Sequence, residues 1–272
     1  MYTLALFEEV NMKIGMSSAC LYPKVPIEES ISVMKSLGFN IGEIFLNTYS
    51  EYSEDFIKTL QEQKEENDFL INSIHAFSSV FEPYLFDSYK RRQRDMLKIF
   101  KKVCRAGSLL KANYYTFHGM RRNNLLDLNM DYIIDVYNEL NYIANEEGIK
   151  LAQENVAWCM SSNIDFLDKL NEKCNNQLHY TLDIKQAFKI GKDPMEYINV
   201  MGNKIVNVHI NDRDESNICL LPGKGDVDFK KICCKLKEMG YNNVYTIEVY
   251  NDNYSSYSEI IDSKDFLQNI LL

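Results

Sequence analysis

Acidic residues and histidines recur where short apolar runs of the sequence end, and such strand ends are where a parallel barrel builds a metal or acid/base site. Glu154, Asp183, His209 and Glu248 each lie at or next to the end of one of these runs. Three carboxylates with one imidazole suit a divalent ion that prefers oxygen ligands, so we expect Mn²⁺ or Mg²⁺, with Co²⁺ or Zn²⁺ as alternatives. Because an unpaired buried charge costs several kcal/mol, these side chains are predicted to share one ion. A set of salt bridges without metal is the alternative.

Eight short runs of apolar or β-branched residues have the length of buried strands. We predict strands over Lys13–Ser17, Ile41–Leu46, Phe69–Ala76, Tyr114–His118, Lys150–Glu154, His179–Asp183, Ile205–Ile210 and Val244–Val249. Segments with helical spacing separate these runs. We predict helices over Ile27–Leu37, Ser53–Asn67, Leu85–Leu110, Met130–Glu147, Asn163–Glu172, Pro194–Met201, Asp228–Met239 and Ser258–Leu271.

Glycines and a proline support these helix boundaries. A glycine follows four of the helical runs, where a left-handed residue lets the chain turn back: Gly38, Gly148, Gly202 and Gly240. Asp193 before Pro194 is typical of a helix start. The stretch Gly223-Lys224-Gly225 resembles a phosphate-binding turn, but acidic residues beside it oppose an anion, so we predict an ordinary tight turn into a helix.

Strict alternation of strands and helices predicts an α/β protein with a parallel sheet, and eight repeats predict a closed (β/α)₈ TIM barrel. This barrel is expected to form a single domain over residues 12–272. A doubly wound open sheet is the alternative, but no glycine-rich phosphate turn follows the early strands at Ser17 or Leu46. Residues 1–11 are predicted to be an N-terminal extension, either a frayed tail or a small added strand.

The composition argues against several classes of function. A formal charge of -9 and a pI near 5.1 disfavour binding to nucleic acid or anionic membranes, because phosphate binding needs a basic face. Seven scattered cysteines without a C-x-x-C pair are typical of reduced thiols. Glu8 and Glu9 interrupt the first apolar run, and no stretch approaches the ~20 apolar residues of a membrane span. We therefore expect a cytoplasmic protein.

The strand ends together resemble a known family. The motifs are Q-E-N at 153–155, L-D-I-K-Q-A at 182–187, V-H-I-N-D-R at 208–213, L-P-G-K-G-D-V-D-F at 221–229 and T-I-E-V at 246–249. In this order and placement, the chain from residue 12 onward resembles the xylose isomerase-like TIM-barrel superfamily. That group includes sugar-phosphate isomerases and epimerases, ketose 3-epimerases, hydroxypyruvate isomerases, inosose dehydratases and, more distantly, AP endonuclease family 2.

The resemblance implies that Glu154, Asp183, His209 and Glu248 bind one metal ion and that Glu154 and Glu248 are also the catalytic acid/base pair. The metal would polarise a ketose carbonyl and stabilise the cis-enediolate left after proton removal. One glutamate would remove a proton, and the other would return one to the opposite face of the carbon or to its neighbour. The expected partner is a small sugar or sugar phosphate, and members of such families often form homo-dimers or tetramers.

Six further residues are predicted to contact the substrate: His75, His118, Arg213, Glu43, Lys185 and Trp158. The two histidines could bind sugar hydroxyls, hold a second, weaker metal, or simply be satisfied residues at the rim of the core. Glu43 could instead pair with a lysine. Arg213 could clamp a hydroxyl, carboxylate or phosphate, or could form a surface salt bridge. Trp158 could stack on a sugar or plug the barrel.

Departures from the family pattern limit the activities that we expect. AP endonucleases add zinc ligands where this chain has Gln186, Asn217 and Cys219, so cleavage of damaged DNA is the least expected activity. Many sugar epimerases also keep a substrate-binding histidine at the position of Gln186, beside Lys185. Two alternatives to an isomerase or epimerase remain open. One is a lyase of the inosose dehydratase type on the same metal site, and the other is a non-catalytic barrel that binds a sugar.

Overall fold

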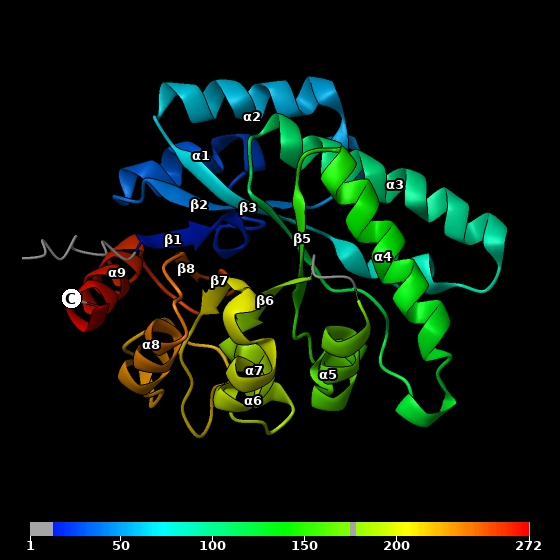
Figure 1. Ribbon diagram of the computed structural model, residues 1–272. Coiled ribbons are helices and arrows are strands. Elements are labelled where there is room, and N and C mark those ends of the chain that lie inside the picture. The colour runs from blue at the N-terminus through cyan, green and yellow to red at the C-terminus, as the bar shows by residue number, and fades with distance from the viewer. Residues whose placement is uncertain (1–12, 175–177, 272) are drawn as a thin grey trace, which may run out of the picture.

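All eight predicted strands are present in the computed structural model, which describes residues 13–174 and 178–271. They are β1 (Lys13–Ser17), β2 (Ile41–Leu46), β3 (Leu70–Ala76), β4 (Tyr114–Phe117), β5 (Lys150–Glu154), β6 (His179–Asp183), β7 (Ile205–Ile210) and β8 (Val244–Ile247). Each strand pairs in parallel with the next, and β8 pairs with β1. The predicted closed (β/α)₈ barrel is therefore confirmed (Figure 1). The predicted extension at residues 1–11 lies outside the described residues.

Helices form an outer layer around the strands (Figure 1). They are α1 (Ile27–Ser36), α2 (Glu54–Glu66), α3 (Lys90–Leu109), α4 (Met130–Glu146), α5 (Ile164–Lys173), α6 (Ile184–Lys189), α7 (Pro194–Met201), α8 (Phe229–Glu238) and α9 (Tyr257–Leu271). The predicted start at Asp193 is confirmed, because Asp193 and Glu196 form a capping box. The four glycines predicted after helices all have positive φ angles. Within residues 13–174 and 178–271, no helix is both long and apolar enough to cross a membrane.

Two helix predictions and two strand ends were wrong. The short helix α6 was missed, because Asp183 both ends β6 and caps α6 through a hydrogen bond from the Gln186 N–H (3.0 Å). The helix predicted from Leu85 begins at Lys90, since residues Glu82–Phe86 form a separate 3₁₀ helix, η4. Strands β4 and β8 end one and two residues earlier than predicted, so His118 and Glu248 follow their strands.

The sequence of β7 shows how the barrel holds polar side chains. All six of its residues are buried, and successive side chains of a strand point to opposite faces. Val208 and Ile210 belong to the apolar core. Asn207 and His209 point the other way, into the barrel, where the Asn207 amide oxygen accepts a hydrogen bond from Thr246 (3.0 Å). The barrel interior therefore contains a polar layer, and this layer lies among the strands that carry the predicted site.

The loop after β7 folds around the side-chain carboxylate of Asp212, one of its own residues. Asp212 accepts hydrogen bonds from the backbone N–H groups of Arg213, Gly223, Gly225 and Val227 at 2.8 to 3.0 Å. A Cβ atom at residue 225 would lie 2.1 Å from the carbonyl oxygen of Arg213, so only glycine fits there. The predicted tight turn is thus confirmed, and its backbone donors bind an internal acid.

Candidate active site

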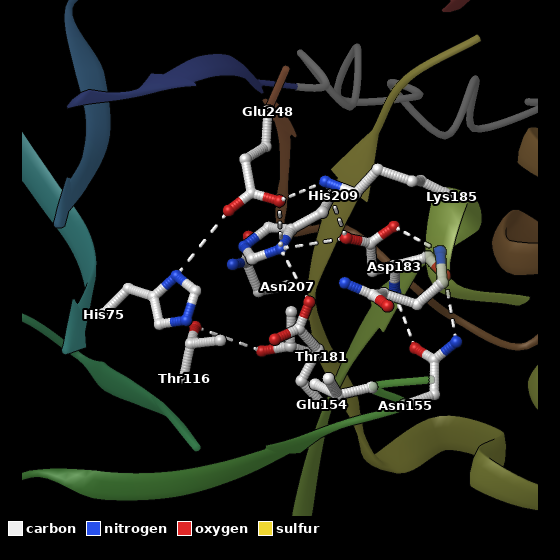
Figure 2. A network of polar contacts seen from close by, with 12 residues as sticks. His75, Thr116, Glu154, Asn155, Thr181, Asp183, Lys185, Asn207, His209 and Glu248 are labelled. Carbon is white, nitrogen blue, oxygen red and sulfur yellow. Dashed lines mark hydrogen bonds and ion pairs between the residues drawn. The ribbon is translucent and has the colours of Figure 1, made fainter. Parts of the chain in front are cut away.

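The four predicted metal ligands meet at the carboxyl-terminal mouth of the barrel (Figure 2). Glu154 ends β5, Asp183 ends β6, His209 lies near the end of β7 and Glu248 follows β8. The Nδ1 atom of His209 lies 3.3 Å from Glu154 Oε1, 3.3 Å from Glu248 Oε2 and 3.8 Å from Asp183 Oδ2. One potential ligand atom from each of the four residues lies within 4.8 Å of the others. Residues from four strand ends that are distant in the sequence therefore form one site.

The charges of this cluster keep Glu154 and Glu248 ionised and His209 protonated. Burial alone would raise the pKa of Glu248, but His209 and Lys185 outweigh burial and hold the pKa well below its usual range. Burial opposes ionisation of Glu154 too, yet His118 and His209 lower its pKa strongly. Burial would lower the pKa of His209, but Glu248 and Glu43 raise it well above the usual value. Without metal, the His209 proton therefore helps to hold the carboxylates together.

Lys185 adds a second buried positive charge. Its Nζ lies 3.1 Å from Glu248 Oε2 and 3.4 Å from Asp183 Oδ2. The same nitrogen lies 5.0 Å from the centre of the Tyr250 ring. Burial would lower the pKa of Lys185, but Asp183 and Glu248 raise it well above the usual value. The ammonium group therefore stays charged and offsets part of the negative charge of the cluster.

The donor set fits a divalent cation. Glu154 Oε2 and Asp183 Oδ2 are buried oxygens that accept no hydrogen bond from the described residues. Their charged neighbours are His118 Nε2, 2.8 Å from Glu154 Oε2, and Lys185 Nζ and His209 Nδ1, 3.4 and 3.8 Å from Asp183 Oδ2. Ionised oxygens with free lone pairs, next to an imidazole nitrogen, are suitable ligands for a hard or borderline divalent ion. The ion would replace the Nδ1 proton of His209, because a ligating imidazole must be neutral.

His75, His118 and Glu154 form a second group of potential ligands. The Nε2 atoms of the two histidines lie 2.7 Å apart, and His118 Nδ1 contacts Ser78 Oγ at 2.5 Å. Burial would lower the pKa of His75, but Glu248 and Glu43 raise it to about 10. This placement is compatible with each role predicted for the histidines, namely hydroxyl binding, a second metal or a structural part in the rim.

The cluster opens into a cavity of about 1030 Å³. Its base is polar, and its walls include the aromatic residues Tyr22, Phe45, Phe77, Trp158 and Tyr250. The Trp158 ring meets the His118 ring edge to face, with 5.7 Å between the ring centres. Aromatic walls around a few convergent polar groups are typical of small-molecule sites and suit the apolar faces of a sugar.

Two of the six predicted substrate contacts lie elsewhere. Glu43 is fully buried and is not among the described residues that line the cavity. Arg213 is also absent from that lining, and its guanidinium carbon lies 4.2 Å from the centre of the Phe188 ring. His75, His118, Lys185 and Trp158 do line the cavity.

One residue that shapes the site was not predicted from the sequence. Glu82, in η4, accepts hydrogen bonds from the backbone N–H groups of His118 and Gly119, both at 2.8 Å, and from the Tyr115 hydroxyl at 2.5 Å. It thereby fixes the turn that carries His118. Glu82 does not stand at a strand end, so no pattern in the sequence marked it. Asn155, in contrast, lies in the Q-E-N motif, and its amide exchanges two hydrogen bonds with the Asp183 backbone.

Comparisons with known proteins agree with this architecture. A family model described as "Xylose isomerase-like TIM barrel" matches residues 31–270. The crystal structure of a D-tagatose 3-epimerase-like protein aligns with a TM-score of 0.78 at 23% identity, over 96% of this chain and 97% of that chain. The structure of IOLI protein with a binding zinc atom aligns with a TM-score of 0.76 at 19% identity, over 96% and 98%. At these identities the structural likeness concerns the fold.

Among curated proteins, inosose dehydratase from Geobacillus kaustophilus (strain HTA426) is 26% identical over 147 residues. This match covers 47% of this chain and 48% of the dehydratase, so it spans about half the length of that relative.

Proposed function

Because the chain belongs to the xylose isomerase-like TIM barrel family, we propose that it is a divalent-metal-dependent isomerase or epimerase of a sugar or sugar phosphate. The observation that carries this proposal is the pair of acids beside His209. Glu154 and Glu248 each place an oxygen 3.3 Å from its Nδ1 atom, and both line the cavity. The zinc atom in the IOLI structure is consistent with a metal in this fold.

Glu154 and Glu248 act as the acid/base pair in this proposal. When bound, a divalent ion supplies a Lewis acid that polarises the substrate carbonyl. One carboxylate removes the proton from the carbon beside the carbonyl, and the other, after taking up a proton from solvent, delivers that proton. Delivery to the opposite face of the same carbon gives the epimer, and delivery to the neighbouring carbon gives the isomer. The two acids come from β5 and β8 and are separated by β6 and β7, so they can approach a substrate from different sides.

Glu154 and Glu248 differ in the proton-carrying side chain that each contacts. His118 Nε2 lies 2.8 Å from Glu154 Oε2, and the His118 side chain is 15% exposed and contacts Ser78. A proton taken up by Glu154 can therefore pass to His118 and from there to water. Lys185 lies behind Glu248, and its raised pKa keeps its proton in place. We therefore expect a proton on Glu154 to exchange with solvent faster than a proton on Glu248.

Solvent exchange tests the proposed function. The metal-loaded protein is incubated in D₂O with a panel of ketoses and ketose phosphates, and the products are analysed by NMR. We expect deuterium at the carbon next to the carbonyl, together with an epimer or isomer, and neither product when a chelator has removed the metal. If a ketose binds to the metal-loaded protein without any exchange or conversion in the panel, the proposal is contradicted.

A lyase of the inosose dehydratase type is the second candidate, because the partial match to that enzyme favours it. In this reaction one glutamate removes the proton beside the carbonyl, and the C–O bond to the β-hydroxyl breaks. The leaving hydroxyl takes a proton from the second glutamate, which has first taken one up from solvent, and departs as water, while the first glutamate returns its proton to solvent. Loss of water from an inosose, without formation of an epimer, would identify this activity.

A further inference from the structure

Glu43 places a carboxylate inside the barrel, beneath the residues of the candidate metal site. Its side chain is fully buried, and it does not belong to the described lining of the cavity. In the register of the sheet, Glu43 pairs with Ser73, whereas His75 pairs with Phe45 two residues further along β2. Glu43 thus lies one layer deeper than the histidine that reaches the cavity, out of reach of a substrate bound there.

The polar layer of the barrel holds this carboxylate in one position. Its Oε2 accepts hydrogen bonds from Ser73 Oγ at 2.7 Å, Thr116 Oγ1 at 2.9 Å and Asn207 Nδ2 at 3.3 Å. These donors come from three different strands, β3, β4 and β7. The other oxygen, Oε1, accepts from Ser17 Oγ at 3.2 Å. So many donors on a buried acid favour its ionised form and fix its orientation.

The same oxygen of Glu43 contacts the predicted metal histidine. His209 Nε2 lies 3.1 Å from Glu43 Oε2, while Nδ1 on the other side of the ring faces Glu154 and Glu248, each at 3.3 Å. A neutral imidazole carries its proton on one nitrogen only, and the hydrogen-bond partner decides which one. A carboxylate can only accept. When a divalent ion takes up Glu154 and Glu248 on the Nδ1 side, Glu43 at Nε2 keeps the proton on Nε2, and the lone pair is left on Nδ1.

We propose that Glu43 is a positioning residue that holds the proton of His209 on Nε2 and so presents Nδ1 as the metal ligand. The inference rests on the proposed metal-dependent function, but it assigns Glu43 a role other than substrate binding. Partners of this kind, which accept a hydrogen bond from a ligating histidine, fix the orientation of the ring and increase its basicity. A carboxylate that only filled the barrel interior would not determine which ring nitrogen carries the proton.

The tautomer of His209 is the most direct readout. The wild-type protein is labelled with ¹⁵N-histidine and loaded with Zn²⁺, which is diamagnetic, and the ring nitrogens are assigned by NMR. Only four histidines are present, so the spectrum is simple. We expect a protonated Nε2 and a metal-bound, unprotonated Nδ1 for His209. The reverse pattern in a Zn²⁺-loaded protein would overturn the proposal, and this measurement needs no variant that might fail to fold.

A pair of variants measures the effect on metal binding. Glu43→Gln keeps the shape of the side chain but offers His209 a neutral acceptor, so we expect Mn²⁺ and Zn²⁺ affinity to fall by about 10- to 100-fold. Ser17→Ala removes a donor from the other oxygen of Glu43 without touching His209 and should leave affinity within about twofold. Affinities are measured by calorimetry with each metal alone.

The outcomes separate this inference from the proposed function. If Glu43→Gln binds metal as tightly as the wild type, the positioning role is wrong while the metal site stands. If the wild-type protein binds neither metal, the proposed function itself has failed. Equal losses in Glu43→Gln and Ser17→Ala would indicate a general loosening of the barrel interior and would also contradict a specific role for Glu43.

Discussion

Glu248→Gln is expected to lower the turnover of a ketose substrate by about 10²- to 10⁴-fold, the usual contribution of a positioned acid or base. An amide has nearly the shape of the carboxylate but cannot take up a proton at neutral pH. Glu248 is ionised in the native site, because His209 and Lys185 outweigh the effect of burial on its pKa. The substitution therefore removes a functioning base rather than an already neutral acid. Turnover is measured with metal in excess, so that weaker metal binding does not limit the rate.

Isotope exchange distinguishes this role from a purely structural one. In Glu248→Gln, Glu154 remains, and it can exchange protons with water through the partly exposed His118 side chain. The epimer whose proton faces Glu154 should still exchange with D₂O, although it is no longer converted. Glu154→Gln should show the complementary pattern, with exchange confined to the other epimer. A Glu248→Gln protein that binds metal and substrate and turns over at the wild-type rate would rule out the acid/base role.

Lys185→Met is expected to destabilise the metal-free protein by about 3–5 kcal/mol, because it leaves buried carboxylates without their charge partner. Asp183 and Glu248 both lie within 3.4 Å of the ammonium group in the native structure. The loss should be much smaller in metal-loaded protein, since a divalent ion neutralises the same carboxylates. Urea unfolding with a chelator, and again with excess Mn²⁺, measures both values.

Lys189→Met is the matched control for this experiment. Lys189 belongs to the same helix, α6, and its Nζ also lies near the Tyr250 ring, 5.6 Å from the ring centre. Unlike Lys185, Lys189 is exposed, and it contacts the Tyr250 hydroxyl instead of the carboxylates. Its replacement should change the free energy of unfolding by no more than about 0.5 kcal/mol. Similar effects of the two substitutions, or no rescue of Lys185→Met by metal, would contradict the electrostatic role of Lys185.

The barrel and the grouping of Glu154, Asp183, His209 and Glu248 could be predicted because both follow from short-range patterns. Alternating strands and helices determine a parallel sheet, and parallel strands bring their carboxyl ends to one face. The polar residues at those ends must then be neighbours. No knowledge of exact strand lengths is needed for that conclusion.

The depth at which a side chain lies inside the barrel could not be predicted in the same way. Glu43 and His75 were both predicted to contact the substrate, yet the stagger between β2 and β3 places Glu43 beside Ser73, one layer below His75. This stagger is a property of the closed sheet and leaves no local signal in the sequence. The direction of Arg213 was hidden for a similar reason, because the packing of its loop against Phe188 depends on tertiary contacts.

Metal content of the purified, untagged protein shows whether the strand-end acids and His209 form a metal site. We expect about one equivalent of Mn, Mg, Co or Zn in the wild type, because a single site needs four ligands, and a clear loss in Glu154→Gln, Asp183→Asn and His209→Ala. His179→Ala, at the opposite end of β6 from Asp183, should keep its metal. No bound metal in the wild type, and no thermal shift when any of these ions is added, would mean that the strand-end acids are structural and would contradict the proposed function.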